Sequence, residues 1–195
     1  MTPLQLILLK LTLILSTLSD NLKVATGGGL YNSQWGKITL TSDSDYNVFN
    51  LGVDELKNAH TLAFEMAGLA LDEIFIINVA GTTNEILNMG ISGADGFESN
   101  ILFNFYDTSS LNIGGVGMRG SILAVDANVN FNSAHMNGSL IANSMRGNGQ
   151  LNWTPYTYDE EVVHVPEPTT LALMGLGLVP LFIRRKRNNK ATLTA

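Results

Sequence analysis

The sequence has no cysteine among its 195 residues and few cations away from its ends. The lack of cysteine excludes a disulfide framework and Cys-ligated zinc or iron–sulfur sites, so stability must come from packing and hydrogen bonding. Residues 24–165 carry fifteen carboxylates against four Lys and Arg, a net charge of −11, whereas the whole chain carries −6. A surface this acidic repels phosphate backbones, which argues against a nucleic-acid partner.

Proline is absent between Pro3 and Pro155, whereas most of the 19 glycines lie there, commonly beside Asn, Ser or Asp. Such pairs mark turns that need positive backbone angles. Short runs rich in Ile, Val, Leu and Phe separate the turns, which predicts an all-β fold, with one short helix possible within 56–71. The predicted strands are 37–40, 46–49, 61–64, 73–79, 100–105, 110–113, 121–124, 128–131 and 139–142.

Residues 125–132 alternate between apolar and polar side chains, so one face of this strand is apolar and the other is amide-rich. The segment GSILA at 120–124 recurs as GSLIA at 138–142, eighteen residues later. A repeat near twenty residues predicts that residues 24–153 form a right-handed parallel β-solenoid, in which each coil buries an apolar ladder against its neighbours. A β-sandwich is the alternative architecture.

The end of the chain combines three unlike elements in order: a Pro-Glu-Pro motif, a short apolar run and a basic cluster. As a helix, the thirteen-residue run 171–183 spans about 20 Å, short of the roughly 30 Å of a bilayer core. The basic cluster would stay in the cytoplasm by the positive-inside rule. This predicts a short C-terminal hydrophobic helix that anchors the chain temporarily and is cut near the motif, whereas a buried core helix or a simple tail anchor is the alternative.

The residues of this end fall into three groups. The motif consists of Val165, Pro166, Glu167 and Pro168. The predicted membrane anchor presents Leu171, Leu173, Leu176, Leu178, Leu181 and Ile183. The basic cluster consists of Arg184, Arg185, Lys186 and Arg187.

Residues 166–187 resemble the PEP-CTERM sorting signal. The resemblance implies recognition by an exosortase in the inner membrane of a Gram-negative bacterium, processing at the motif, and delivery to the cell surface or extracellular matrix. Such systems usually accompany exopolysaccharide production. Residues 154–165 then form a linker, and residues 188–195 form a tail.

The N-terminal run Leu4–Leu18 is apolar enough for a secretory signal, but it contains Lys10 and has no basic residue before it. Residues 16–19 are a poor cleavage site. We interpret residues 1–23 as a degraded signal peptide, with a start codon that could lie downstream of the true one. The alternative is an amphipathic or buried N-terminal apolar helix.

The body resembles the choice-of-anchor A domain over residues 46–152. The resemblance rests on VFNLGVDEL at 48–56, FIINVAGT at 75–82, ILFNFYDTSSL at 101–111, GSILAVDANVNF at 120–131 and GSLIANSMRGNGQLN at 138–152. It implies a surface adhesin with a β-helical domain and no assigned reaction. Departures from the family pattern occur at 124–127, which reads AVDA, and at 150–153, which reads QLNW.

Candidate sites within the body are few. The histidines His60, His135 and His164 lack metal-ligand spacing, so exposed or turn positions are expected. No Gly-x-Ser-x-Gly elbow occurs. The strand face bearing Asp126, Asn128 and Asn130 could bind calcium, although a solvated or ladder-forming face is the favoured interpretation.

The sequence therefore predicts a non-enzymatic protein without cofactor or metal. The favoured function is an adhesin that associates with exopolysaccharide, other surface proteins or a biofilm. The alternative is a β-solenoid protein that binds or degrades extracellular polysaccharide, with exposed Trp and Tyr near 153–158 stacking on sugar rings.

Overall fold

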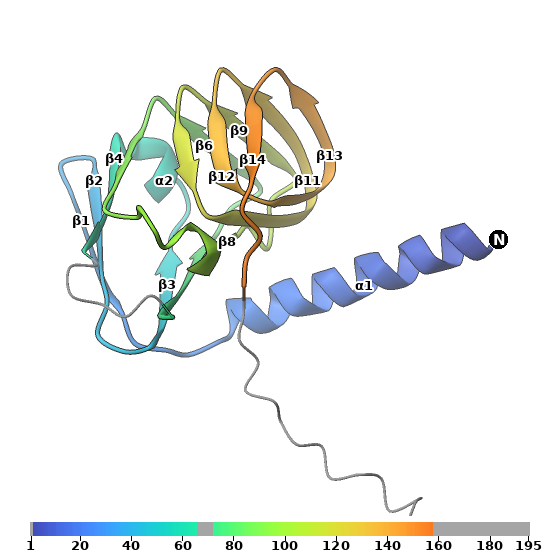
Figure 1. Ribbon diagram of the computed structural model, residues 1–195, viewed down its shortest axis with the longest axis horizontal. Helices are drawn as coiled ribbons and strands as arrows, with labels where there is room; N and C mark the ends of the chain where they lie inside the picture. The colour runs from blue at the N-terminus through green and yellow to red at the C-terminus, as the bar shows by residue number, and fades with distance from the viewer. Residues whose placement is uncertain (1, 66–71, 158–195) are drawn as a thin grey trace, which may run out of the picture. The chain divides into compact units, whose positions relative to one another are not determined.

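The computed structural model describes residues 2–65 and 72–157, and its dominant element is the β-strand (Figure 1). The helices are α1 (Pro3–Lys23), α2 (Glu55–Asn58) and the 3-10 helix η1 (Glu98–Asn100). The strands are β1 (Leu30–Gln34), β2 (Lys37–Thr41), β3 (Tyr46–Leu51), β4 (Thr61–Glu65), β5 (Ile74–Val79), β6 (Thr83–Leu87), β7 (Gly90–Ser92), β8 (Ile101–Asn104), β9 (Ser110–Gly114), β10 (Gly117–Arg119), β11 (Ser121–Asn132), β12 (His135–Gly138), β13 (Leu140–Gly147) and β14 (Gln150–Trp153). The predicted all-β class is confirmed.

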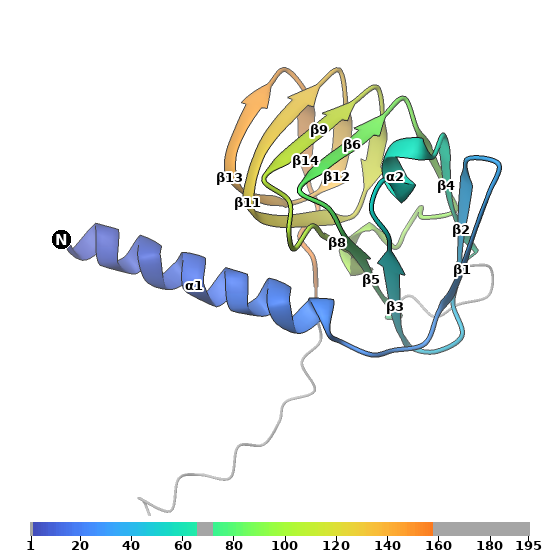
Figure 2. The same cartoon turned by 180° about the vertical axis from the view of Figure 1, so that it is seen from behind.

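The strands form three sheets whose pairs are parallel, apart from the antiparallel pair of β1 and β2. One sheet has the order β1-β2-β4-β7 and a second has the order β10-β12-β14. The seven-stranded sheet has the order β3-β5-β8-β11-β9-β6, with β13 also paired to β11. Figure 2 shows that β6, β9, β11 and β13 lie side by side in a curled sheet. Parallel pairing argues against the β-sandwich alternative, whose sheets are antiparallel.

The chain passes through the sheets in a recurring order. It runs through β4, β5 and β6, and then through β7, β8 and β9, and each strand of the first set pairs in parallel with its counterpart in the second. Parallel partners cannot be joined by a tight hairpin, so the chain visits the other sheets before it returns. As a result, residues 24 to 29 positions apart in the sequence are partners on adjacent strands. Lys37 is paired with Thr61, and Thr61 is paired with Gly90.

The eighteen-residue repeat is confirmed as a structural register. Ile122 of β11 lies beside Leu140 of β13, and the hydroxyl groups of Ser121 and Ser139 are 2.9 Å apart. Asn112 and Asn130, also eighteen residues apart, are partners between β9 and β11. Earlier in the chain, more residues separate partners on adjacent strands, since Ser110 is paired with Thr83, 27 residues away.

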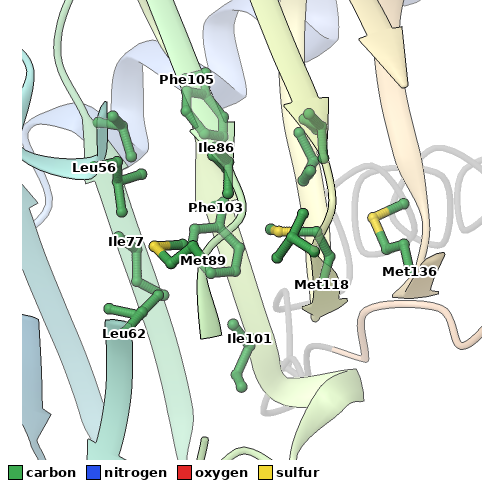
Figure 3. Packing of buried hydrophobic residues seen from close by; sticks show 14 of the residues in the cluster. Leu56, Leu62, Ile77, Ile86, Met89, Ile101, Phe103, Phe105, Met118 and Met136 are labelled. Carbon is green, nitrogen blue, oxygen red and sulfur yellow. The ribbon is translucent and has the colours of Figure 1, made fainter. Parts of the chain in front are cut away.

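The hydrophobic core lies between the sheets and contains side chains from nearly every strand. Figure 3 shows Leu62, Ile77, Phe103 and Met118 pointing into this interior from β4, β5, β8 and β10. Full burial of one such side chain contributes about 1.5–3 kcal/mol. Five fully buried phenylalanines supply much of the volume: Phe49, Phe75, Phe103, Phe105 and Phe131.

Several predicted boundaries were wrong. The predicted strands 121–124 and 128–131 are parts of the single strand β11, with a register shift between Ala124 and Asn128 against β13. The strands β1, β6, β7, β10, β12 and β14 were not predicted. Within 56–71 the described helical residues are those of α2, which begins at Glu55 and ends at Asn58.

The long helix of the described chain is N-terminal. α1 begins with a capping box formed by Thr2 and Gln5, and its last turns contact β5, β8 and β11. Among the described residues, α1 is the one helix long and apolar enough to cross a membrane. The predicted C-terminal hydrophobic helix lies outside the described residues.

Candidate functional site

The outer surface of β6, β9, β11 and β13 carries two rows of polar side chains, which we name the polar ladder. Strand alternation places residues two apart on the same face, so each strand contributes one residue to each row. The first row contains Thr83, Ser110, Asn128 and Ser144, and the second contains Glu85, Asn112, Asn130 and Arg146. The sequence-predicted amide face of β11 is thus part of a surface that spans four strands.

The second row forms a continuous chain of hydrogen bonds. The Arg146 guanidinium donates from Nε to Asn130 Oδ1. Asn130 Nδ2 donates to Asn112 Oδ1 over 2.7 Å, and Asn112 Nδ2 donates to Glu85 Oε1 over 3.4 Å. Every bond points the same way, from the cation on β13 to the carboxylate on β6. These bonds fix the orientation of both amide groups.

The first row is tied together at Asn128. Its Oδ1 accepts a 2.6 Å bond from the Ser144 hydroxyl and a 3.0 Å bond from Asn143 Nδ2. This leaves the amide nitrogen of Asn128 on an exposed face with its two N–H groups directed by the amide plane. The ladder therefore presents donors whose rotamers are already restricted.

An open hollow of about 600 Å³ adjoins the second row. Gly114 and Gly147 are among its lining residues, and a Cβ on Gly114 would lie 3.2 Å from the Asn132 carbonyl oxygen. The main lining residues are Leu87, Asn112, Gly114, Asn130, Asn132 and Arg146. The amide groups of this lining, beside the aliphatic Leu87 and Ile113, suit a ligand with both hydroxyl groups and C–H faces.

The calcium interpretation gains no support from the two asparagines. The Oδ1 atoms of Asn128 and Asn130 already accept hydrogen bonds, and they form the ladder that the sequence favoured. Asp126 is exposed and borders a separate hollow. Residues 2–65 and 72–157 contain no group of three or more His, Asp or Glu side chains that could hold a metal ion.

The two described histidines occupy exposed turn or strand-end positions, as expected. His60 Nε2 lies 2.9 Å from the Trp35 carbonyl oxygen, and His60 Nδ1 lies 3.1 Å from the Thr61 hydroxyl. His135 begins β12 and is exposed. His164 lies outside the described residues, as do the motif Val165–Pro168, the anchor residues and the basic cluster.

The aromatic side chains do not gather on the ladder. Trp153 ends β14, in the sheet away from the ladder, and its side chain is 79% exposed. Trp35 is 94% exposed in the turn between β1 and β2. Of the predicted aromatic cluster near 153–158, Trp153 is therefore separate from the polar ladder, and Tyr158 lies outside the described residues.

Sequence reasoning identified Asn128 and Asn130 but missed the other members of their rows. Glu85 lies in the unpredicted strand β6, and Arg146 follows the point where the predicted strand 139–142 stopped. The eighteen-residue repeat was the available signal for Asn112, because it aligns 112 with 130. No comparable repeat links Glu85 to Asn112, which are 27 residues apart.

Comparison with known family models identifies a sorting signal and an adhesive domain. Residues 164–187 match the PEP-CTERM protein-sorting motif, which directs export through the membrane to the cell surface and processing by exosortase. No curated protein and no solved structure matches the chain. Residues 11–153 match the family described as Putative Ice-binding-like adhesive domain. Since this match spans more than half of the 195 residues, the chain belongs to that ice-binding-like adhesive family.

Proposed function

We propose that this exported surface protein is a non-catalytic adhesin that holds exopolysaccharide on its polar ladder and so contributes to a biofilm matrix. The observation that carries the proposal is the pair of hydrogen-bonded rows across β6, β9, β11 and β13. The adhesive family and the sorting motif support a role at the cell surface.

The spacing of the ladder suits a repeating ligand. Neighbouring strands in a sheet lie about 4.8 Å apart, so the ladder repeats its donors and acceptors at that interval across four strands. A polysaccharide offers hydroxyl groups at regular intervals along its length. Because hydrogen bonds already restrict Asn112, Asn128 and Asn130, binding costs less side-chain entropy than it would on a mobile surface.

The charge of the ladder favours a polymer rich in hydroxyl groups over a strongly charged one. Its second row ends in Glu85 at one side and Arg146 at the other, so the row carries no net charge. Six of its eight members are neutral amide or hydroxyl residues. The acidic body outside the ladder also repels polyanions such as nucleic acid.

In finer detail, we infer that the parallel strands form a right-handed β-solenoid of the choice-of-anchor A type. The recurring path through the three sheets and the eighteen-residue register support the solenoid. A non-enzymatic role is supported by the exposed positions of His60 and His135 and by the hydrogen-bonded state of the ladder amides.

Binding of the mature protein to the producer's exopolysaccharide tests this proposal. Asn130→Leu on the ladder is compared with Asn137→Leu on β12, because Asn137 is likewise paired to an asparagine, Asn152, but lies in the other sheet. Loss of one or two hydrogen bonds to the polymer should weaken binding by Asn130→Leu about three- to thirtyfold. Asn137→Leu should bind as the unaltered protein does.

Equal loss in both variants, or no binding by the unaltered protein, contradicts the ladder as the adhesive surface. The same samples are assayed for new reducing ends in the polymer. Steady release of reducing ends would instead favour the polysaccharide-degrading alternative.

A further inference from the structure

We propose that α1 stays attached to the exported domain and embeds its apolar side chains in a lipid bilayer, so that it tethers the adhesive domain to a membrane surface. This goes beyond adhesion through the polar ladder, and it assigns residues 1–23 a lasting role that their interpretation as a degraded signal peptide does not.

The end of α1 is held by two asparagines of the seven-stranded sheet. Asn104 Nδ2 donates to the Ser19 carbonyl oxygen over 2.9 Å, and the Ser19 hydroxyl donates to Asn104 Oδ1 over 2.6 Å. Asn78 Nδ2 donates to the Leu22 carbonyl oxygen over 2.8 Å. Leu22 lies in the last turn, where carbonyl groups lack an i+4 partner, and Asn78 adds to the 3.2 Å bond that the Leu22 oxygen accepts from the Ala25 N–H group. Asn104 fastens the preceding turn through Ser19. Ser19, Asn78 and Asn104 are all buried.

The capping asparagines are themselves fixed by the sheet. Asn50, Asn78 and Asn104 occupy the same register in β3, β5 and β8. Asn104 Nδ2 also donates to Asn78 Oδ1, and Asn78 Nδ2 donates to Asn50 Oδ1. The helix end therefore extends an asparagine row that spans three strands, and it is integrated with the domain instead of lying loosely beside it.

Lys23 adds a second contact next to this cap. Its ammonium group lies 3.5 Å from Asp107 Oδ2 and 4.3 Å from the centre of the Tyr106 ring. Both partners lie in the loop between β8 and β9. Because the groups are partly exposed, this contact adds little energy, but it orients the last turn of the helix.

The family match places the same residues inside the domain. It begins at residue 11, so residues 11–23 of α1 lie within the matched adhesive domain. A leader that is cut off is expected to precede the domain that it exports. Cleavage within 16–19 would separate most of α1 from the asparagines that hold its end. Ser19 would then be at or near the new N-terminus, or would be lost.

The rest of α1 exposes an apolar surface that nothing in the described chain covers. Nine of its large aliphatic residues between Leu4 and Leu18 are 44% to 66% exposed. The 16 residues 3–18 that precede the docked end span about 24 Å as an α-helix, enough to insert through most of the roughly 30 Å hydrocarbon core. Lys10 is the single charged side chain between Pro3 and Ser19, and its long aliphatic chain can reach the headgroup region.

The distribution of these residues favours lipid over a second copy of the chain. Ile7, Leu11 and Ile14 lie along one side of the helix, but Leu6 and Leu13 lie on another side and are equally exposed. A dimeric coiled coil would need one narrow apolar seam with polar flanks. An apolar surface that extends around most of the helix instead fits a surrounding lipid phase.

The absence of cysteine allows a test that reports on α1 alone. The full chain with Leu11→Cys carries an environment-sensitive fluorophore at that position, and Asp20→Cys is the matched control near the docked end. Both positions are exposed, so neither substitution disturbs the core. In vesicles of phosphatidylethanolamine and phosphatidylglycerol, we expect a several-fold rise and a blue shift in fluorescence at position 11, and little change at position 20. Because the label sits on α1, the C-terminal apolar run cannot produce this signal.

The mass of the protein recovered from the surface of the producing cells is measured alongside, and we expect it to include residues 11–23. A mature N-terminus at or after Ser19 would overturn the proposal. So would unchanged fluorescence at position 11 in vesicles, or an intermolecular disulfide that the unlabelled Leu11→Cys variant forms in the presence of the same vesicles.

Discussion

Gly138 lies where the backbone of one segment closely approaches the backbone of the segment eighteen residues earlier. A methyl group on Gly138 would overlap the Gly120 carbonyl group and lie 3.0 Å from the Ser121 nitrogen. We expect Gly138→Ala to lower the free energy of unfolding by about 1–3 kcal/mol, because the backbone has to move apart. Urea unfolding followed by circular dichroism measures the change.

Gly90→Ala is the control for this substitution. Gly90 also lies in a strand, but its nearest atom to an added Cβ is the His60 carbonyl oxygen at 3.9 Å, an ordinary contact. We expect its urea midpoint to stay close to that of the unaltered protein. A stable Gly138→Ala would mean that the levels near Gly120 are farther apart than described.

Glu98 connects η1 to β10 and makes stability dependent on pH. Burial alone raises its pKa, but hydrogen bonds from the backbone N–H groups of Glu98 and Gly96, together with the Arg119 guanidinium 2.8 Å away, outweigh burial and hold the pKa below its ordinary value. A depressed pKa in the folded state means that the ionised carboxylate stabilises the fold above the unfolded-state pKa of about 4.3. This stabilisation is lost as the pH falls through the lower folded-state pKa.

We therefore expect the urea midpoint to fall as the pH is lowered below about 4.3, and Glu98→Gln to reduce that dependence. Glu98→Gln should already be less stable at pH 7, because Arg119 loses the nearer of its two charged partners and keeps Asp95, 3.0 Å away. Glu65→Gln is the comparison, since Glu65 is an exposed carboxylate with a single hydroxyl partner, Thr41, among the bonds described. An unchanged pH profile in Glu98→Gln would contradict this account.

At the scale of elements, runs rich in Ile, Val, Leu and Phe predicted their strands, and strands without such runs were missed. β5 and β8 were predicted because Ile and Phe dominate them. β10 and β12 were missed because they are short and lack Ile, Val, Leu and Phe, while Gly and Asn, which are depleted in strands, occur in them. Pairing with each other and with β14 makes them strands. β11 was predicted as the two strands 121–124 and 128–131, which the structure joins through Val125, Asp126 and Ala127.

The candidate site was predictable only in part for a related reason. Periodicity shows which face of β11 is polar, but it does not show which strands lie beside it. The neighbours come from parallel pairing across 16 to 27 residues, so Glu85 and Arg146 could not be assigned to the rows of Asn130 before the register was known.

The asparagine row under α1 gives a prediction at this scale. Asn104→Ala removes the cap on Ser19 and a partner of Asn78, and it leaves buried polar groups with fewer bonds. We expect it to lower the free energy of unfolding by about 1–3 kcal/mol and to speed hydrogen exchange at the end of α1. Hydrogen exchange followed by mass spectrometry measures the local change.

Asn112→Ala is the comparison for Asn104→Ala, because Asn112 lies at the partly exposed surface of the neighbouring strand β9. Its effect on stability should stay within about 0.5 kcal/mol, as for most surface substitutions. Equal effects of the two substitutions would show that the buried row does not hold α1.

At the scale of the whole molecule, the chain combines an acidic adhesive body with a strongly basic end. The basic cluster belongs to the matched sorting segment, whereas the body belongs to the matched adhesive domain. The match to the sorting motif confirms the predicted sorting signal. This signal is separate in sequence from the body that carries the polar ladder.

Processing at the sorting motif gives a prediction at this scale. We expect a chain with Pro166→Ala and Pro168→Ala to remain uncut, to keep its apolar run and Arg184–Arg187, and to accumulate in the membrane fraction. Intact-mass measurement of surface and membrane fractions distinguishes the two forms. Thr194→Ala, beyond the matched segment, is the control, and normal release of the double variant would contradict exosortase processing at this motif.

The most direct test of the proposed function is to map where exopolysaccharide contacts the mature protein by hydrogen exchange with and without the polymer. We predict protection confined to peptides from β6, β9, β11 and β13, which carry the polar ladder. Protection confined instead to β10, β12 and β14, or no protection at a polymer concentration that saturates binding, would contradict adhesion through the ladder.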